Sequence, residues 1–102
     1  MKPQRIFMPL ALAALLPAVF LAACSGGEQT VRGHVQDVQA RSLTEVETLT
    51  LEDSDGKVWR FQSEGNIGFT PSHIREHMLR GEEMTVYYTR QGDRLTAVRV
   101  TD

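Results

Sequence analysis

FTPSHIREHMLRG, residues 69–81, is the clearest helix signal in the chain and decides how the rest is organised. Thr70 is a residue type that caps helices through its side-chain oxygen. Pro71 suits the first helical position, where its missing N–H costs nothing. Gly81 matches the residue that ends many helices in a left-handed conformation. The stretch therefore predicts one helix over residues 71–80.

Five strands are predicted around this helix, three before it and two after it. They alternate between apolar and polar residues or are rich in Thr, Val and Leu, and turn-forming Asp and Gly residues separate several of them. The apolar side chains of the first strand change parity near Gln36-Asp37, which indicates a bulge there. The predicted strands are Thr30–Arg41, Val46–Glu52, Lys57–Gln62, Met84–Tyr88 and Leu95–Thr101.

The order strand, strand, strand, helix, strand, strand over residues 30–102 resembles the OB-fold. That fold is a five-stranded Greek-key barrel that binds oligonucleotides and oligosaccharides in its various members. The resemblance implies a mainly β protein, a small antiparallel OB-like barrel with one helix between strands three and four. An open antiparallel sheet covered by one helix is the alternative that the same order permits. Element order, not a signature motif, carries the resemblance.

The beginning of the chain has a different composition. Two basic residues, Lys2 and Arg5, precede the 18 residues Ile6–Ala23, none of which is charged. A basic start, an apolar middle and small residues before a break are typical of a secretory signal peptide. An uncleaved transmembrane helix is the competing interpretation, because about 18 apolar residues just span a bilayer. Pro9 and Pro17 would interrupt such a helix, so the signal peptide is favoured.

The apolar segment ends at Leu21-Ala22-Ala23-Cys24, and Cys24 is the only cysteine of the chain. With Ser25-Gly26-Gly27 after it, this motif resembles the lipobox of bacterial lipoproteins. The resemblance implies that residues 1–23 are cleaved off between Ala23 and Cys24, and that Cys24 carries lipid, including fatty acids such as palmitate. It implies attachment to a membrane of the cell envelope, facing the periplasm or the exterior. Ser25 favours the outer membrane where the organism has one.

Cleavage would leave a lipidated tether, residues 24–29, and a domain over residues 30–102. Removal of 23 residues from 102 leaves 79, which is enough for one domain with a marginal core but not for a large catalytic cleft. The loss of Lys2 and Arg5 leaves nine basic residues against 13 acidic ones, a net charge of −4. An acidic domain is poorly suited to nucleic acid, which is bound mainly through Lys and Arg.

His73-Ile74-Arg75-Glu76-His77 matches the H-x-x-E-H pattern of the inverted zinc proteases. That activity is rejected, because the family needs a larger domain and a distant acidic ligand. Helical periodicity places His73, Glu76 and His77 away from Ile74, so we expect a charged outer face. The two histidines remain candidate ligands for copper or zinc, since imidazole suits both ions.

Aromatic residues supply the remaining candidates. Trp59, Phe61 and Tyr88 fall on apolar faces of their strands and are expected in the core. Tyr87 has the opposite parity and is expected to face outward with Arg60, as a candidate pair for binding a ligand.

No catalytic constellation can be located in the sequence, so we expect no enzyme and no cofactor other than the lipid on Cys24. The sequence predicts a lipid-anchored, non-enzymatic binding or assembly module with an envelope protein as its partner. The first alternative is a periplasmic Cu/Zn-binding module through His73 and His77. The second is an OB domain that binds oligosaccharide or nucleic acid, of which nucleic acid is disfavoured by the charge.

Overall fold

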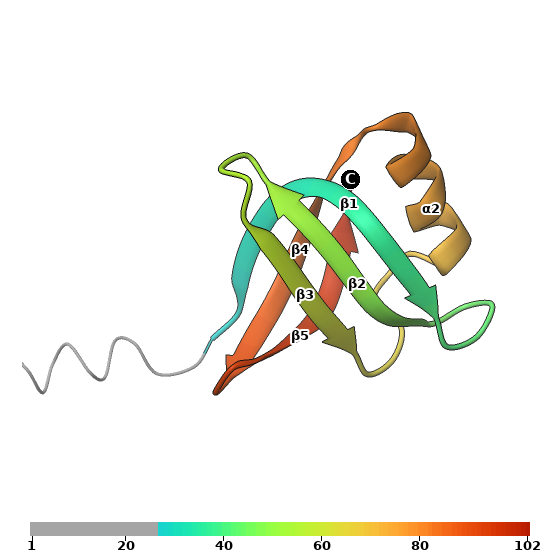
Figure 1. Cartoon of the computed structure of the whole chain (residues 1–102). Coiled ribbons are helices and arrows are strands. Elements are labelled where there is room, and N and C mark those ends of the chain that lie inside the picture. The colour runs from blue at the N-terminus through green and yellow to red at the C-terminus, as the bar shows by residue number, and fades with distance from the viewer. Residues whose placement is uncertain (1–26) are drawn as a thin grey trace, which may run out of the picture.

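The computed structural model describes residues 27–102, which form a five-stranded barrel and one helix (Figure 1). The strands follow the order β1–β2–β3–β5–β4, and β4 pairs back with β1, so the barrel is closed. This confirms the OB-like architecture and excludes the open sheet. The elements are β1 (Gln29–Ala40), β2 (Val46–Asp53), β3 (Val58–Ser63), α2 (Pro71–Arg80), β4 (Glu83–Gln91) and β5 (Arg94–Thr101).

The predictions for the beginning of the chain lie outside the described residues. They concern the signal peptide over residues 1–23, the cleavage after Ala23 and the lipid on Cys24. Between residues 27 and 102, no helix combines the length and the apolar character needed to cross a membrane.

β1 is long and is shared between two partner strands. Its first half, Gln29–His34, pairs with β4, and its second half, from Gly33 onward, pairs with β2. The register with β2 shifts between Val35 and Asp37, which confirms the predicted bulge. Gly33 lies where the two pairings overlap, and a Cβ atom there would be 2.2 Å from the carbonyl oxygen of Glu52. Only glycine permits this close approach of two backbones.

α2 begins and ends where the sequence signals place it. The side-chain oxygen of Thr70 accepts a backbone N–H of the first turn at 3.2 Å, and Pro71 occupies the first helical position. Gly81 has a φ of 71°, and its N–H donates to a carbonyl of the last turn at 3.1 Å. The helix packs against β1 and β4, and Arg75 donates from Nη2 to the carbonyl oxygen of Val38 in β1 at 3.2 Å. Local caps therefore define the helix, and β1 holds it in place.

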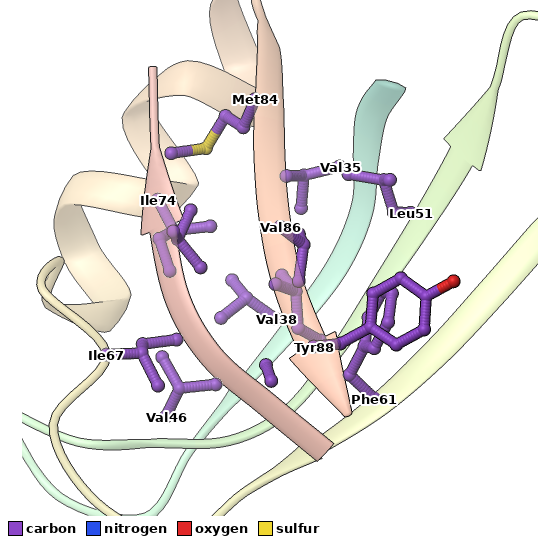
Figure 2. Packing of buried hydrophobic residues seen from close by; sticks show 13 residues of the cluster. Val35, Val38, Val46, Leu51, Phe61, Ile67, Ile74, Met84, Val86 and Tyr88 are labelled. Carbon is purple, nitrogen blue, oxygen red and sulfur yellow. The ribbon is translucent and has the colours of Figure 1, made fainter. Parts of the chain in front are cut away.

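The interior of the barrel is filled by the side chains that alternate inward along the strands (Figure 2). Trp59 lies at the edge of this core, with its ring centroid 5.7 Å from that of Tyr88. Burial of each larger apolar side chain stabilises the fold by about 1.5–3 kcal/mol, so the core residues set the strand register. The buried apolar residues are Val35, Val38, Val46, Leu49, Leu51, Phe61, Ile67, Ile74, Met84, Val86, Tyr88, Ala97 and Val100.

Candidate functional site

His73 and His77 lie one turn apart on α2, with ring centroids 5.2 Å apart. His73 is exposed and stacks on Phe69 at 4.3 Å between centroids. The prediction that both histidines lie on the outer face is wrong for His77, which is only 9% exposed. The reason is helical spacing. His77 follows Ile74 by three residues and is therefore only about 60° from it around the helix axis, on the buried flank.

His77 lies between two carboxylates from different parts of the chain. Its Nδ1 atom is 2.8 Å from Oε1 of Glu82, and its Nε2 atom is 3.9 Å from Oδ2 of Asp102. The first contact has the distance of an ion pair, but Nδ1 makes no hydrogen bond with the described residues. Arg32 and Glu83, paired at 3.2 Å, complete the rim of this shallow depression. The cluster joins the end of α2 to the end of β5 and the start of β4.

The predicted metal pair gains no further ligand in this arrangement. Among residues 27–102, no group of three or more His, Cys, Asp or Glu side chains is placed to hold a metal ion. The two carboxylates approach opposite ring nitrogens of His77, whereas a metal ion binds one nitrogen of an imidazole. His73 and His77 thus offer two ligands at most, against the four of a typical structural zinc site.

Arg60 and Tyr87, the predicted ligand-binding pair, are not brought together. Arg60 is exposed on β3 and Tyr87 is half-buried on β4, and β5 lies between these two strands. Tyr87 pairs in register with Arg99, whose guanidinium lies 3.8 Å from the centre of the Tyr87 ring. Arg60, two residues before Gln62, aligns with the start of β5, roughly 17 Å farther along that strand. The two side chains therefore serve different surfaces.

The contact between β3 and β5 is the shortest of the five strand pairings. It consists of two parallel residue pairs, whereas β1 and β2 share seven. Three surface depressions lie along this contact, and neighbouring depressions share lining residues. We call these three adjoining depressions together the seam groove. It runs from Arg60 and Asp93, past Gln62 and Arg94, to Glu64 and Val98.

Charged side chains of both signs line the seam groove in equal number. Arg94 donates from Nε to Oε1 of Gln62 at 2.9 Å and lies 3.6 Å from a carboxylate oxygen of Glu64. Arg41 donates from Nη2 to the carbonyl oxygen of Ser63 at 2.7 Å. The basic residues of the groove are Arg41, Arg60 and Arg94, and the acidic ones are Glu47, Glu64 and Asp93. The formal charges of the groove therefore cancel.

Arg60 differs from the other two arginines of the groove. Within residues 27–102 it makes no ion pair and no side-chain hydrogen bond, and its side chain is exposed beside Gln62 and Asp93. Arg41 and Arg94 are both held by neighbouring groups. Because its donors are not used by the described domain, Arg60 is the cation best placed to meet a ligand.

The turn between β2 and β3 is a polar cluster with a structural role. Oδ1 of Asp53 accepts the backbone N–H groups of Asp55 and Lys57, each at 2.9 Å, and its Oδ2 accepts Nε1–H of Trp59 at 3.0 Å. The Trp59 hydrogen bond, followed by that of the Lys57 backbone, lowers the pKa of the Asp53 carboxyl. The ammonium of Lys57 lies 4.2 Å from the centre of the Trp59 ring. Asp53 therefore organises the turn.

The comparisons with known proteins add no relative to this picture: no family model, no curated protein and no solved structure matches the chain. The function of the site must therefore be inferred from its geometry. Arg60 was the one groove residue that the sequence singled out. Gln62 also lines the groove, but its neighbours on β5 depend on a parallel contact between distant strands, which no local pattern reveals.

Proposed function

We propose that the chain is a lipid-anchored protein of the cell envelope whose barrel is a non-enzymatic binding module, and that the seam groove holds an extended segment of a partner protein. The row of three adjoining depressions beside β3 and β5 supports this most directly. OB-folds use the outer face of strands two and three, together with the loop between strands four and five, to hold chain-like ligands. Arg60, Gln62 and Arg94 lie in this region.

The chemistry of the groove favours a polypeptide segment. Its charges alternate and cancel, and a peptide offers both amide groups and side chains of either sign. The aromatic rings of β3, Trp59 and Phe61, do not line the groove, so it lacks the stacking platform on which bases are usually held. An extended peptide also suits a row of depressions that adjoin one another beside two strands.

The anchor is the second half of the proposal. Leu21-Ala22-Ala23-Cys24 supports cleavage before Cys24 and lipid attachment to it, with the barrel held at a membrane surface of the envelope. Several acyl chains on one residue satisfy the rule that stable anchoring requires more than one weak signal. The mass of the N-terminal peptide of the mature protein tests this half. An acylated Cys24 supports it, and a free Met1 contradicts it.

Site-specific photo-crosslinking tests the groove. A benzophenone amino acid at Glu47, an exposed groove residue, is compared with the same substitution at Glu76, on the outer face of α2. We expect one discrete protein adduct from position 47, none from position 76, and loss of the adduct in an Arg60→Glu background. Peptide mapping then places the crosslink within one segment of the partner. Equal adducts from both positions, or adducts that survive Arg60→Glu, overturn the groove as the binding site.

Oligosaccharide binding is the other outcome of this test. A chito-oligosaccharide is added to the labelled domain while its backbone amide signals are followed by NMR. Shifts centred on Arg60 and Gln62, in a protein that gives no adduct from position 47, would replace the peptide by a sugar chain. We expect no such shifts, because no aromatic ring lines the groove between Arg60 and Arg94.

A further inference from the structure

The turn between β4 and β5 projects past the point where the chain enters the barrel. Gln29, the first residue of β1, pairs with Tyr88, and β4 continues for three more residues to Gln91. At about 3.4 Å per residue, the turn extends roughly 10 Å beyond the start of β1. Figure 1 shows the β4–β5 turn at the end of the barrel where β1 begins, and the β1–β2 loop at the opposite end.

The predicted anchor precedes the first residue of β1 by a short stretch of sequence. Cys24 precedes Gln29 by five residues, and a chain of that length reaches ~17 Å when fully extended. A lipid on Cys24 would therefore keep the start of β1 within that distance of the membrane surface. The β4–β5 turn extends roughly 10 Å beyond the start of β1, which is more than half of that distance.

The chemistry of the turn suits phospholipid headgroups rather than the membrane interior. Residues 90–94 read Arg-Gln-Gly-Asp-Arg and contain no apolar side chain. Arg90 is exposed and makes no ion pair or side-chain hydrogen bond within residues 27–102. Arg94 is held by Gln62 and Glu64 in the seam groove. Arg90 is therefore the cation of the turn that is available to a lipid phosphate.

From these observations we infer that the β4–β5 turn is the membrane-facing surface of the domain and that Arg90 contacts anionic phospholipid headgroups. This inference rests on the lipid anchor of the proposed function. It gives the anchored barrel one preferred orientation, with the β1–β2 loop directed away from the bilayer. The end of the seam groove at Asp93 and Arg94 then lies near the membrane, and the end at Val98 lies farther from it.

The lone cysteine makes a direct test practical. In the mature protein the thiol of Cys24 would be consumed by lipid, so a second cysteine can be labelled with a fluorophore selectively. The label is placed at Gln91 in the turn or, as the matched control, at Leu43, which is 92% exposed in the β1–β2 loop. The full-length lipidated protein is reconstituted into phosphatidylethanolamine vesicles with phosphatidylglycerol, and quenching by headgroup-nitroxide lipids is measured.

We expect quenching at Gln91 to be several times stronger than at Leu43, and Arg90→Glu to reduce that ratio toward one. The reduction should disappear in vesicles without phosphatidylglycerol, because it depends on anionic headgroups. Equal quenching at the two positions, in protein that floats with the vesicles, overturns the inference and leaves the anchor intact. Protein that does not float with the vesicles contradicts the anchor and the inference together. The photo-crosslink at position 47 tests the groove independently of both results.

Discussion

The barrel contains two contacts between strands that differ sharply in how they are made. β1 and β2 pair antiparallel over seven residue pairs, and a loop of five residues joins them. β3 and β5 pair parallel over two residue pairs, and α2 and the whole of β4 lie between them in the sequence. Neighbouring antiparallel strands form local contacts, whereas a parallel contact requires a long connection. The three depressions of the seam groove adjoin the second contact, so the proposed binding groove lies at the least paired part of the barrel.

The substitution with the largest expected effect on stability would disrupt the contact between β1 and β2. In Gly33→Val, the new Cβ atom would lie 2.2 Å from the carbonyl oxygen of Glu52, so β1 and β2 must separate locally. Such backbone shifts cost roughly 3 kcal/mol or more in a small domain. Urea denaturation followed by circular dichroism measures this loss. The control is Arg32→Ala, which removes a surface ion pair of β1 and should cost below about 1 kcal/mol. Equal stability of the two variants would show that the close approach is not required.

The second-largest loss of stability is expected at the end of α2, the helix that lies between β3 and β5 in the sequence. Gly81 ends α2 at a φ of 71°, a conformation that a β-branched residue adopts only with strain. Gly81→Val should therefore lower the free energy of unfolding by about 1–2 kcal/mol. The thermal midpoint measures this, with Glu76→Ala on the exposed face of α2 as the control. An unchanged midpoint in Gly81→Val would show that the helix end tolerates another conformation.

The sequence predicted the first kind of contact better than the second. The bulge near Gln36-Asp37, the helix caps and the inward parity of Phe61 all follow from neighbouring residues, and each is confirmed. The closure of the barrel by β3 and β5 was predicted only through element order. No local pattern in either strand specifies that Gln62 lies opposite Thr96.

Apart from His77, the predictions for the candidate site also succeeded where they rested on a local pattern and failed where they depended on distant parts of the chain. Arg60 was predicted to face outward and does so, but its predicted partner Tyr87 lies on another surface beside Arg99. Parity along a strand tells which face a side chain occupies and not which distant strand lies beside it. The periodicity argument misplaced His77, because a residue three positions after Ile74 lies only about 60° from it around the helix axis. Asp102, which approaches its ring, follows the last strand and is too remote in sequence to be anticipated.

A smaller loss of stability is expected from a substitution at the contact between β3 and β5. Arg94→Ala removes the hydrogen bond to Gln62 and the ion pair with Glu64, whose side chains are largely exposed. The loss of stability should be below about 0.5 kcal/mol, because exposed ion pairs contribute little. The same variant should weaken the crosslink from position 47, since Arg94 lines the groove. A loss of stability as large as that of Gly33→Val would mean that the groove residues hold the barrel closed.

The smallest effect is expected at the β2–β3 turn and appears as a dependence on pH. Hydrogen bonds from Trp59 and the Lys57 backbone hold the pKa of Asp53 below its ordinary value, so folding favours the ionised carboxylate. The contribution of the Asp53 carboxylate to the free energy of unfolding is present above its pKa in the unfolded chain, near 4. This contribution is lost as the pH falls through the lower pKa of the folded state. Asp53→Asn should therefore be less stable than the wild type at neutral pH.

This difference should narrow in acid, where the wild-type carboxyl also becomes neutral. Urea midpoints measured at neutral pH and at several values below pH 4 test the trend. Asp55→Asn is the matched control, because the Asp55 carboxylate accepts no hydrogen bond within residues 27–102, whereas that of Asp53 accepts three. A difference between wild type and Asp53→Asn that stays constant with pH would mean that the turn needs the shape of the side chain and not its charge. The hairpin that leads into β3 would then be fixed by geometry alone, as the β1–β2 contact is at Gly33.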